Sequence, residues 1–289
     1  MRFSYAESMV DPAFYPDLAR AAEDAGYDSM VIPDSLCYPK VSDSTYPFNP
    51  DGSREFLEDK PFIEPFSLIP ALGAVTERLR FVTFVVKLPM RHPLVAAKQA
   101  TSVAVMTNNR FAFGVGTSPW PEDYELVGVP WEGRGRRMDE CLDIVRGLSA
   151  GGFFEYHGEF ASFPPCGFGV KPVQKPRPPM FFGGLGLPKR AAARVAKYGL
   201  EGWIGIMDTP EAIAIWRKAI AEELVRLECP KSIDELEICS MIPFEITSER
   251  TDQTDKGKLT PTLVGTAQQI TGRLYAPLWW MATRWPGGD

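Results

Sequence analysis

Histidine is scarce in this sequence, whose 289 residues contain only two, His92 and His157. The two lie far apart along the chain, which argues against the His-rich metal centre of many barrel hydrolases and against a Ser-His-Asp triad. The five cysteines are odd in number and scattered, with no Cys-x-x-Cys pair. This pattern indicates reduced thiols. We therefore expect neither a metal site nor a disulfide framework.

An excess of positive charge is also lacking. Lys and Arg number 31 against 37 Asp and Glu, for a net charge of −6, and the absence of a basic stripe argues against a nucleic-acid partner. No apolar run approaches the length of a membrane span, and the N-terminus lacks the basic-then-apolar pattern of a signal peptide. We expect a soluble, cytoplasmic protein without a membrane partner. Its 45% hydrophobic residues can build a full core.

What the sequence does contain is a strand–helix–strand pattern, clearest between residues 79 and 128. A run of Val, Phe and Thr over Arg80–Val86 predicts a strand buried on both faces. Pro93 can open a helix, because a first-turn residue needs no N–H donor, and Arg110–Val115 predicts the next strand. The helix between them carries its apolar face at Ala96, Ala100, Val103 and Ala104. A helix between two buried strands is typical of a right-handed crossover in a parallel sheet.

The same unit recurs along the chain, and we count eight strands and seven helices. The remaining strands are predicted at Arg2–Ser8, Asp28–Ile32, Met180–Phe182, Gly202–Ile206, Leu236–Ile246 and Leu278–Trp285. The first helix, capped by Asp11 and Pro12, is expected to bury one stripe, made of Phe14, Leu18, Ala21, Ala22 and Ala25. The fold class is therefore α/β, a (β/α)8 TIM barrel in one domain spanning residues 1–289.

Two long stretches interrupt this pattern, at residues 33–63 and 151–179. The first is rich in turn signals such as Tyr38-Pro39 and Tyr46-Pro47. It follows the carboxyl end of a strand, which is the catalytic face of such barrels, so it is either a functional loop or a packed surface excursion. The second contains FFEYHGEF, which predicts a hairpin turning at His157-Gly158.

Several strings in the chain resemble a known family. KLPMRHP, NNRFAFGVGTSPWPEDYELVGVP and the early MRFSYAE and SMVIPDS segments are similar to the luciferase-like monooxygenase superfamily. Its members are (β/α)8 barrels that use reduced flavin or the deazaflavin coenzyme F420. The string GVGTSPWPEDYELVGVP most resembles the F420-dependent actinobacterial branch. The likeness covers residues 1 to 206 well and weakens afterwards.

The resemblance assigns the cofactor ring to two strand ends. It implies a non-prolyl cis peptide at Phe84-Val85 that supports the middle of the ring. Gly116, Thr117 and Ser118 would wall a flat heterocycle, or else form a simple turn. Trp120 either faces the pocket or staples the loop. The acid pair Glu122-Asp123 is expected in the first turn of a helix, with contact to the substrate as the alternative.

The phosphate is assigned to a glycine-rich turn. Gly183-Gly184-Leu185-Gly186 lies between a strand and a helix N-terminus, where exposed N–H groups and the helix dipole suit an anion. Such turns are common in α/β proteins, and the alternative is a turn without a ligand. The resemblance is what gives this loop a contact with the cofactor phosphate.

Candidate catalytic residues lie at the ends of the first two strands. Asp34 matches an acidic residue that contacts the cofactor ring in the family. The next position is often a histidine that helps proton transfer, and here it is Ser35. A serine is too weakly acidic to replace that histidine unaided. Glu7, at the end of the first strand, is either a substitute acid or a buttress of the barrel.

The resemblance therefore implies an oxidoreductase that transfers a hydride between coenzyme F420 and a small organic substrate, such as a carbonyl, alcohol, imine or activated alkene. Two alternatives stay open. One is an FMN-dependent monooxygenase on the same barrel. The other is a non-catalytic cofactor-binding barrel, which the Ser35 departure favours. The expected partners are the small-molecule substrate and a second copy in a homodimer.

Overall fold

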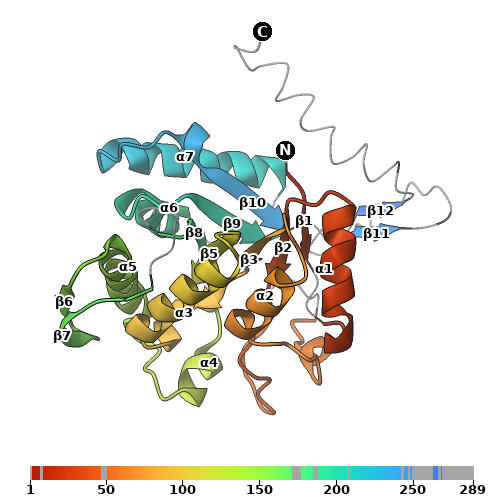
Figure 1. Cartoon of the computed structure of the whole chain (residues 1–289), viewed down its shortest axis with the longest axis horizontal. Coiled ribbons are helices and arrows are strands. Elements are labelled where there is room, and N and C mark those ends of the chain that lie inside the picture. Colours follow the sequence, from red (N-terminus) through yellow and green to blue (C-terminus); the bar gives the residue numbers. More distant parts are fainter. Residues whose placement is uncertain are drawn as a thin grey trace, which may run out of the picture.

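The computed structural model describes residues 2–6, 9–46, 51–170, 177–184, 188–206, 209–241, 244–246 and 263–265, with residues 248 and 268. Its centre is a parallel sheet that curves into a nearly closed barrel (Figure 1). Neighbouring strands follow the order β1 (Ser4–Ala6), β2 (Ser29–Ile32), β3 (Arg80–Thr83), β5 (Phe111–Gly116), β8 (Met180–Gly183), β9 (Gly202–Ile206) and β10 (Glu237–Met241). The predicted strand at Leu278–Trp285 lies outside the described residues, and the other seven predicted strands each have a counterpart in the sheet. The prediction of one strand over Leu236–Ile246 is wrong in extent, because Phe244–Ile246 belongs to a separate sheet.

Helices cover the outer face of this sheet (Figure 1). They are α1 (Tyr15–Asp24), α2 (Pro65–Gly73), α3 (Pro93–Met106), α4 (Pro121–Leu126), α5 (Arg134–Ala150), α6 (Pro188–Lys197) and α7 (Pro210–Arg226). Five of these seven begin at a proline, a residue that suits the first turn because its missing N–H would have had no partner there. Short 3₁₀ helices lie at η1 (Pro12–Phe14), η2 (Glu55–Leu57), η3 (Leu88–Met90) and η4 (Ile233–Glu235).

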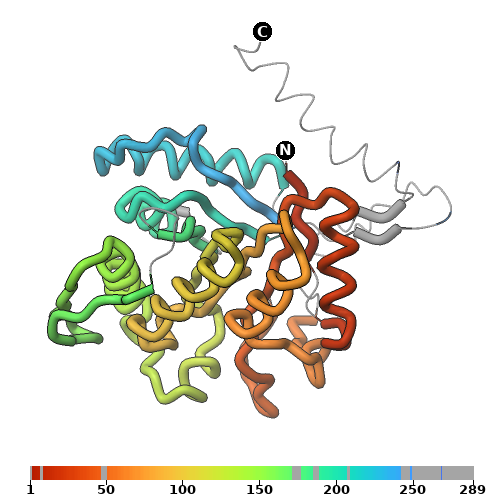
Figure 2. Tube along the Cα trace, in the orientation of Figure 1, coloured from red at the N-terminus to blue at the C-terminus, as the bar shows by residue number. Residues whose placement is uncertain are grey.

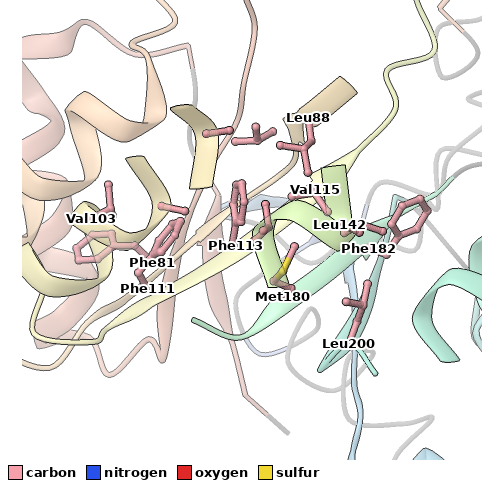
Figure 3. Close-up of a cluster of buried hydrophobic side chains, with 14 of the residues drawn as sticks. Phe81, Leu88, Val103, Phe111, Phe113, Val115, Leu142, Met180, Phe182 and Leu200 are labelled. Carbon is pink, nitrogen blue, oxygen red and sulfur yellow. The ribbon is translucent and has the colours of Figure 1, made fainter. Parts of the chain in front are cut away.

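Alternating side chains of the strands build two cores. The outer core, between sheet and helices, contains Phe81, Phe111 and Phe113 (Figure 3). The inner core fills the barrel and consists of Val82, Ala112, Phe181 and Ile204. Because successive strand residues point to opposite faces, a strand such as Phe111–Gly116, all of whose residues are buried, must be apolar throughout.

The helix faces test the predicted periodicity. In α3, the four predicted positions are all buried. In α1 only Ala22 of the predicted stripe is buried, together with Tyr15 and Ala19, and Phe14 is 56% exposed. The 3₁₀ turn η1 directly precedes α1 and turns further per residue than an α-helix. The register of the face is therefore displaced from a stripe counted from Asp11.

The two excursions differ in structure. The first, described over residues 33–46 and 51–64, is irregular apart from η2. The second contains the hairpin of β6 (Phe154–His157) and antiparallel β7 (Ser162–Cys166). The predicted turn at His157-Gly158 would start the second strand within FFEYHGEF, whereas β7 starts after that string, at Ser162. A separate parallel pair, β11 (Phe244–Ile246) and β12 (Leu263–Gly265), lies beyond the main sheet.

Ion pairs link the amino ends of the first and last described strands of the barrel. Arg2 Nη2 lies 2.6 Å from Glu237 Oε1, and Arg80 Nη2 lies 3.8 Å from the same oxygen. Arg80 Nη1 also contacts Asp28 Oδ2 at 3.2 Å. We call Arg2, Asp28, Arg80 and Glu237 the amino-end network. It joins β1, β2 and β3 to β10, which do not all pair as neighbours in the sheet.

Candidate functional site

A backbone bulge marks the carboxyl end of the third barrel strand. Val82 pairs with Ala112, and Val86, in β4 (Val86–Lys87), pairs with Val115. Between these two pairs, residues 83–85 of this strand lie opposite only residues 113 and 114 of β5. The third strand thus carries one extra residue, as in a β-bulge. The Phe84–Val85 peptide within it is cis, at the place that the resemblance predicted. Phe84 and Val85 are half-buried, between residues that are fully buried.

Glycines make room for this bulge. A Cβ at Gly114 would lie 1.9 Å from the carbonyl oxygen of Thr83, a separation that no side chain permits. The Thr83 hydroxyl donates to Gly114 O at 2.8 Å. Two further glycines flank Val85, since a Cβ at Gly116 would lie 2.6 Å from Val85 Cγ2 and one at Gly183 2.7 Å from Cγ1. Val85 therefore occupies the space above two neighbouring strands, and we call Val85, Gly116 and Gly183 the valine cradle.

Asp34 lies next to the bulge and is held on both carboxylate oxygens. Its Oδ2 accepts from the backbone N–H of Lys87 at 3.0 Å, and its Oδ1 accepts from Arg91 Nη2 at 2.9 Å. The side chain is only 2% exposed. The carboxylate thus ties the end of β2 to the chain after the bulge. Ser35 beside it is half-buried, and Glu7 lies outside the described residues.

A buried ion pair lies under the loop that follows β5, and sequence reasoning did not single out its lysine. Lys87 Nζ contacts Asp123 Oδ2 at 2.5 Å, and the Ser118 hydroxyl donates to the same oxygen at 2.6 Å. Trp120 N–H in turn donates to Ser118 Oγ at 3.1 Å. Ser118 has a left-handed φ of 58°. The signal available in the sequence was a lysine at the end of an apolar strand, a place where charge is rare unless paired.

The loop also receives side-chain contacts from the first excursion, whose Cα trace Figure 2 draws in red to orange. Trp120 stacks with Tyr46 at a ring distance of 5.9 Å, and the Arg54 guanidinium lies 4.3 Å from the centre of the Trp120 ring. These contacts favour the stapling interpretation of Trp120. The aromatic residues of this loop thus pack on each other, since Tyr46 also meets Phe56 edge-on at 5.2 Å.

Glu122 of α4 is hydrogen-bonded to Ser42 and Ser44 of the same excursion, and we call these contacts the Glu122 latch. Its Oε1 accepts from the Ser42 hydroxyl at 2.5 Å and its Oε2 from the Ser44 hydroxyl at 2.8 Å. Arg54 Nη2 lies 3.7 Å away. Burial raises the pKa of Glu122, but the hydrogen bonds from Ser42 and Ser44 lower it further, to about 2. The latch carboxylate is therefore ionised throughout the neutral range.

The glycine-rich turn is only partly described. Gly183 ends β8 and Gly184 follows it, and Leu185 and Gly186 lie outside the described residues. A Cβ at Gly184 would lie 3.0 Å from Ala191 Cβ of α6 and 3.7 Å from Trp216. Close packing against α6 thus explains this glycine without a phosphate. Substituting it would disturb the packing of α6 as well as any ligand.

A cavity of about 240 Å³ lies beside this site, outside the barrel centre. Met90, Arg91 and Pro93 line one side of it, and Arg137, Cys141 and Phe160 line another. It shares Arg91 with the Asp34 anchor but contains none of the predicted cofactor residues. Among the described residues, no three His, Cys, Asp or Glu side chains are grouped as metal ligands would be.

Comparison with known proteins decides the family. The family model described as luciferase-like monooxygenase matches residues 3–253. The chain belongs to this family. It is 49% identical over 268 residues to the uncharacterized protein Rv0940c of Mycobacterium tuberculosis, an alignment that covers 92% of this chain and 89% of the relative.

Two solved structures show where the fold recurs with different cofactors. The coenzyme F420-dependent tetrahydromethanopterin reductase of Methanopyrus kandleri is 16% identical with a TM-score of 0.68, over 86% of this chain and 67% of that one. The oxygenating constituent of 3,6-diketocamphane monooxygenase from Pseudomonas putida, in complex with FMN, is 14% identical with the same TM-score, over 86% and 68%. The fold is thus common to both cofactor classes. No helix in the described part of the chain is long and apolar enough to cross a membrane.

Proposed function

We propose that this protein is an oxidoreductase that transfers a hydride between coenzyme F420 and a small organic substrate. The observation that carries the proposal is the valine cradle at the carboxyl end of the barrel. In this cradle the half-buried side chain of Val85 packs on Gly116 of β5 and Gly183 of β8, where a larger residue would leave it no room. Such barrels place their active sites at this end.

The residues present suit a flat heterocycle with a phosphate tail. Phe84 and Val85 would support the ring from below, and Gly116, Thr117 and Ser118 would border its edge. Gly183–Gly186 and the start of α6 would take the phosphate, since a helix N-terminus favours an anion. Bound F420 would supply a carbon-borne hydride, so that only two-electron transfer is needed, while the protein supplies orientation and exclusion of water.

Asp34 takes an anchoring role in this proposal, because both of its carboxylate oxygens are already engaged. It fixes the chain after the bulge, and with it the support beneath the ring. Ser35, beside Asp34, would lie where the ring edge and the substrate meet, and its hydroxyl could donate a hydrogen bond to a substrate oxygen without acting as a strong acid. Glu7 keeps its two alternatives, as a proton donor or a buttress.

The choice of F420 over FMN rests on the likeness of GVGTSPWPEDYELVGVP to the F420-dependent branch. The FMN-bound structural neighbour supports the second candidate, an FMN-dependent monooxygenase, with an equal TM-score. A cofactor-binding barrel without turnover is the third. Equilibrium titration with F420 and FMN, each oxidised and reduced, separates the first two. Tighter binding of F420 supports the proposal, whereas equal or tighter binding of FMN transfers the assignment to the second candidate.

The cradle itself is tested by Gly183→Ala. The added Cβ would meet Val85 Cγ1 at 2.7 Å and displace the valine toward the ring, so the Kd of the cofactor should rise about tenfold, or about 1.4 kcal/mol. Gly169→Ala is the matched control, because a Cβ there meets open space. If Gly183→Ala binds the cofactor as the control does while remaining folded, the cradle does not support the ring.

A further inference from the structure

The ion pair of Lys87 and Asp123 is unusual in its degree of burial. The two side chains are 11% and 5% exposed, and their charged atoms lie 2.5 Å apart. Charged groups are rarely placed in such surroundings unless each has a partner. Replacing a buried pair by apolar residues often leaves stability unchanged or improves it, so stability alone does not account for the pair.

The position of Lys87 connects it to the valine cradle. It follows Val85 by two residues and pairs in register with Gly116, which is the glycine beneath the valine. Its backbone N–H is fixed by Asp34, and its Nζ by Asp123. A movement of Lys87 along the strand therefore moves Val85 over Gly116.

The position of Asp123 connects it to the opposite wall. It lies in the first turn of α4 and accepts from Ser118, whose hydroxyl also receives the Trp120 N–H. Ser118 adopts a left-handed φ, a conformation that non-glycine residues take only where surrounding contacts hold them. One carboxylate oxygen, Asp123 Oδ2, thus accepts hydrogen bonds from Lys87, on the bulge side of the site, and from Ser118, on the loop side.

We infer that Lys87 and Asp123 are positioning residues that set the spacing between the support beneath the cofactor ring, at Val85, and the wall at its edge, at Thr117 and Ser118. This inference rests on the proposed function for its ligand. The juxtaposition itself, of the residues after the bulge with the loop after β5, is a property of the protein without ligand.

The test compares variants of this pair with a matched pair elsewhere. Lys87→Met and the double variant Lys87→Met/Asp123→Asn remove the link, and the double variant leaves no unpaired buried charge. Arg177→Met is the control, because Arg177 is also buried and contacts Glu201 at 2.7 Å, beside the amino end of β8. Each protein is measured for thermal unfolding, for cofactor binding and for amide hydrogen exchange without cofactor.

We expect the double variant to bind F420, or FMN where the wild type prefers it, at least tenfold more weakly and with an altered absorption spectrum of the bound cofactor. Exchange should quicken at residues 84–87 and 116–120 in the ligand-free protein. Arg177→Met should lower the unfolding temperature without either change. Unaltered exchange at both segments, or wild-type affinity and spectrum, overturns the inference. A wild type that binds neither cofactor overturns the proposed function instead, and the exchange measurement still decides whether the pair positions the two segments.

Discussion

The two ends of the barrel both use ion pairs to connect strands, but they do so in different surroundings. At the amino end, Arg2 is 51% exposed and Glu237 is 34% exposed. At the carboxyl end, Lys87 and Asp123 are almost fully buried. Exposed pairs are worth about 0–1 kcal/mol, whereas breaking a buried pair is strongly destabilising. The amino-end network can therefore tolerate loss of a contact, whereas the Lys87–Asp123 pair holds its residues in one arrangement.

The largest expected effects come from substituting one buried glycine at each end of the barrel. Gly114→Ala would place a Cβ 1.9 Å from Thr83 O at the bulge, and Gly202→Ala would place one 2.2 Å from Glu237 O at the amino end. Both clashes are with backbone atoms, so each should lower the free energy of unfolding by about 3 kcal/mol, at the upper end of overpacking costs. Denaturant unfolding measures this loss.

Cofactor titration of the same two variants sharpens the comparison. Gly114→Ala should also weaken cofactor binding in the fraction that remains folded, because the bulge beneath Val85 must shift. Gly202→Ala should leave the affinity of its folded fraction unchanged. Equal effects of the two variants on affinity would show that the carboxyl end has no special relation to the cofactor.

The second effect concerns the Glu122 latch at the carboxyl end. Glu122→Gln should cost about 1–2 kcal/mol at pH 7, since hydrogen bonds to a charged acceptor are lost. The pKa of Glu122 is lowered in the folded protein to about 2, so its contribution is complete above the unfolded value near 4.5 and disappears as the pH falls toward 2.

Unfolding of wild type and Glu122→Gln at pH 7, 5 and 3 checks this dependence. The difference between the two should be constant from pH 7 to 5 and smaller at pH 3. A difference that grows on acidification would mean that the carboxylate is not stabilised by Ser42 and Ser44 in the folded state.

The sequence predicted the repeating architecture better than the site. Buried strands and helices that begin at proline, as at Pro93 and Pro210, follow from local rules, and those elements lie where they were expected. The buried face of α1 differs from the predicted one because a 3₁₀ turn precedes the helix. Hydrophobic periodicity alone does not distinguish a 3₁₀ turn from the first turn of an α-helix.

The contacts of the site depend on residues distant in sequence. Lys87 and Asp123 are 36 positions apart, and no local pattern pairs them. The cis peptide at Phe84–Val85 was placed by resemblance to the family alone. Gly184 was interpreted as a ligand position, although its contact with Ala191 explains it through packing.

The smallest expected effect is at the amino-end network. Arg2→Met removes a 2.6 Å contact with Glu237, but both groups are partly exposed, so the free energy of unfolding should fall by less than about 1 kcal/mol. Salt should erase this difference, because the screening length shortens to about 3 Å at 1 M ionic strength. Urea unfolding of both proteins at low salt and at 1 M NaCl measures it. A loss that persists undiminished at high salt would mean that the network is as sheltered as the pair at the carboxyl end, and the contrast between the two ends would no longer hold.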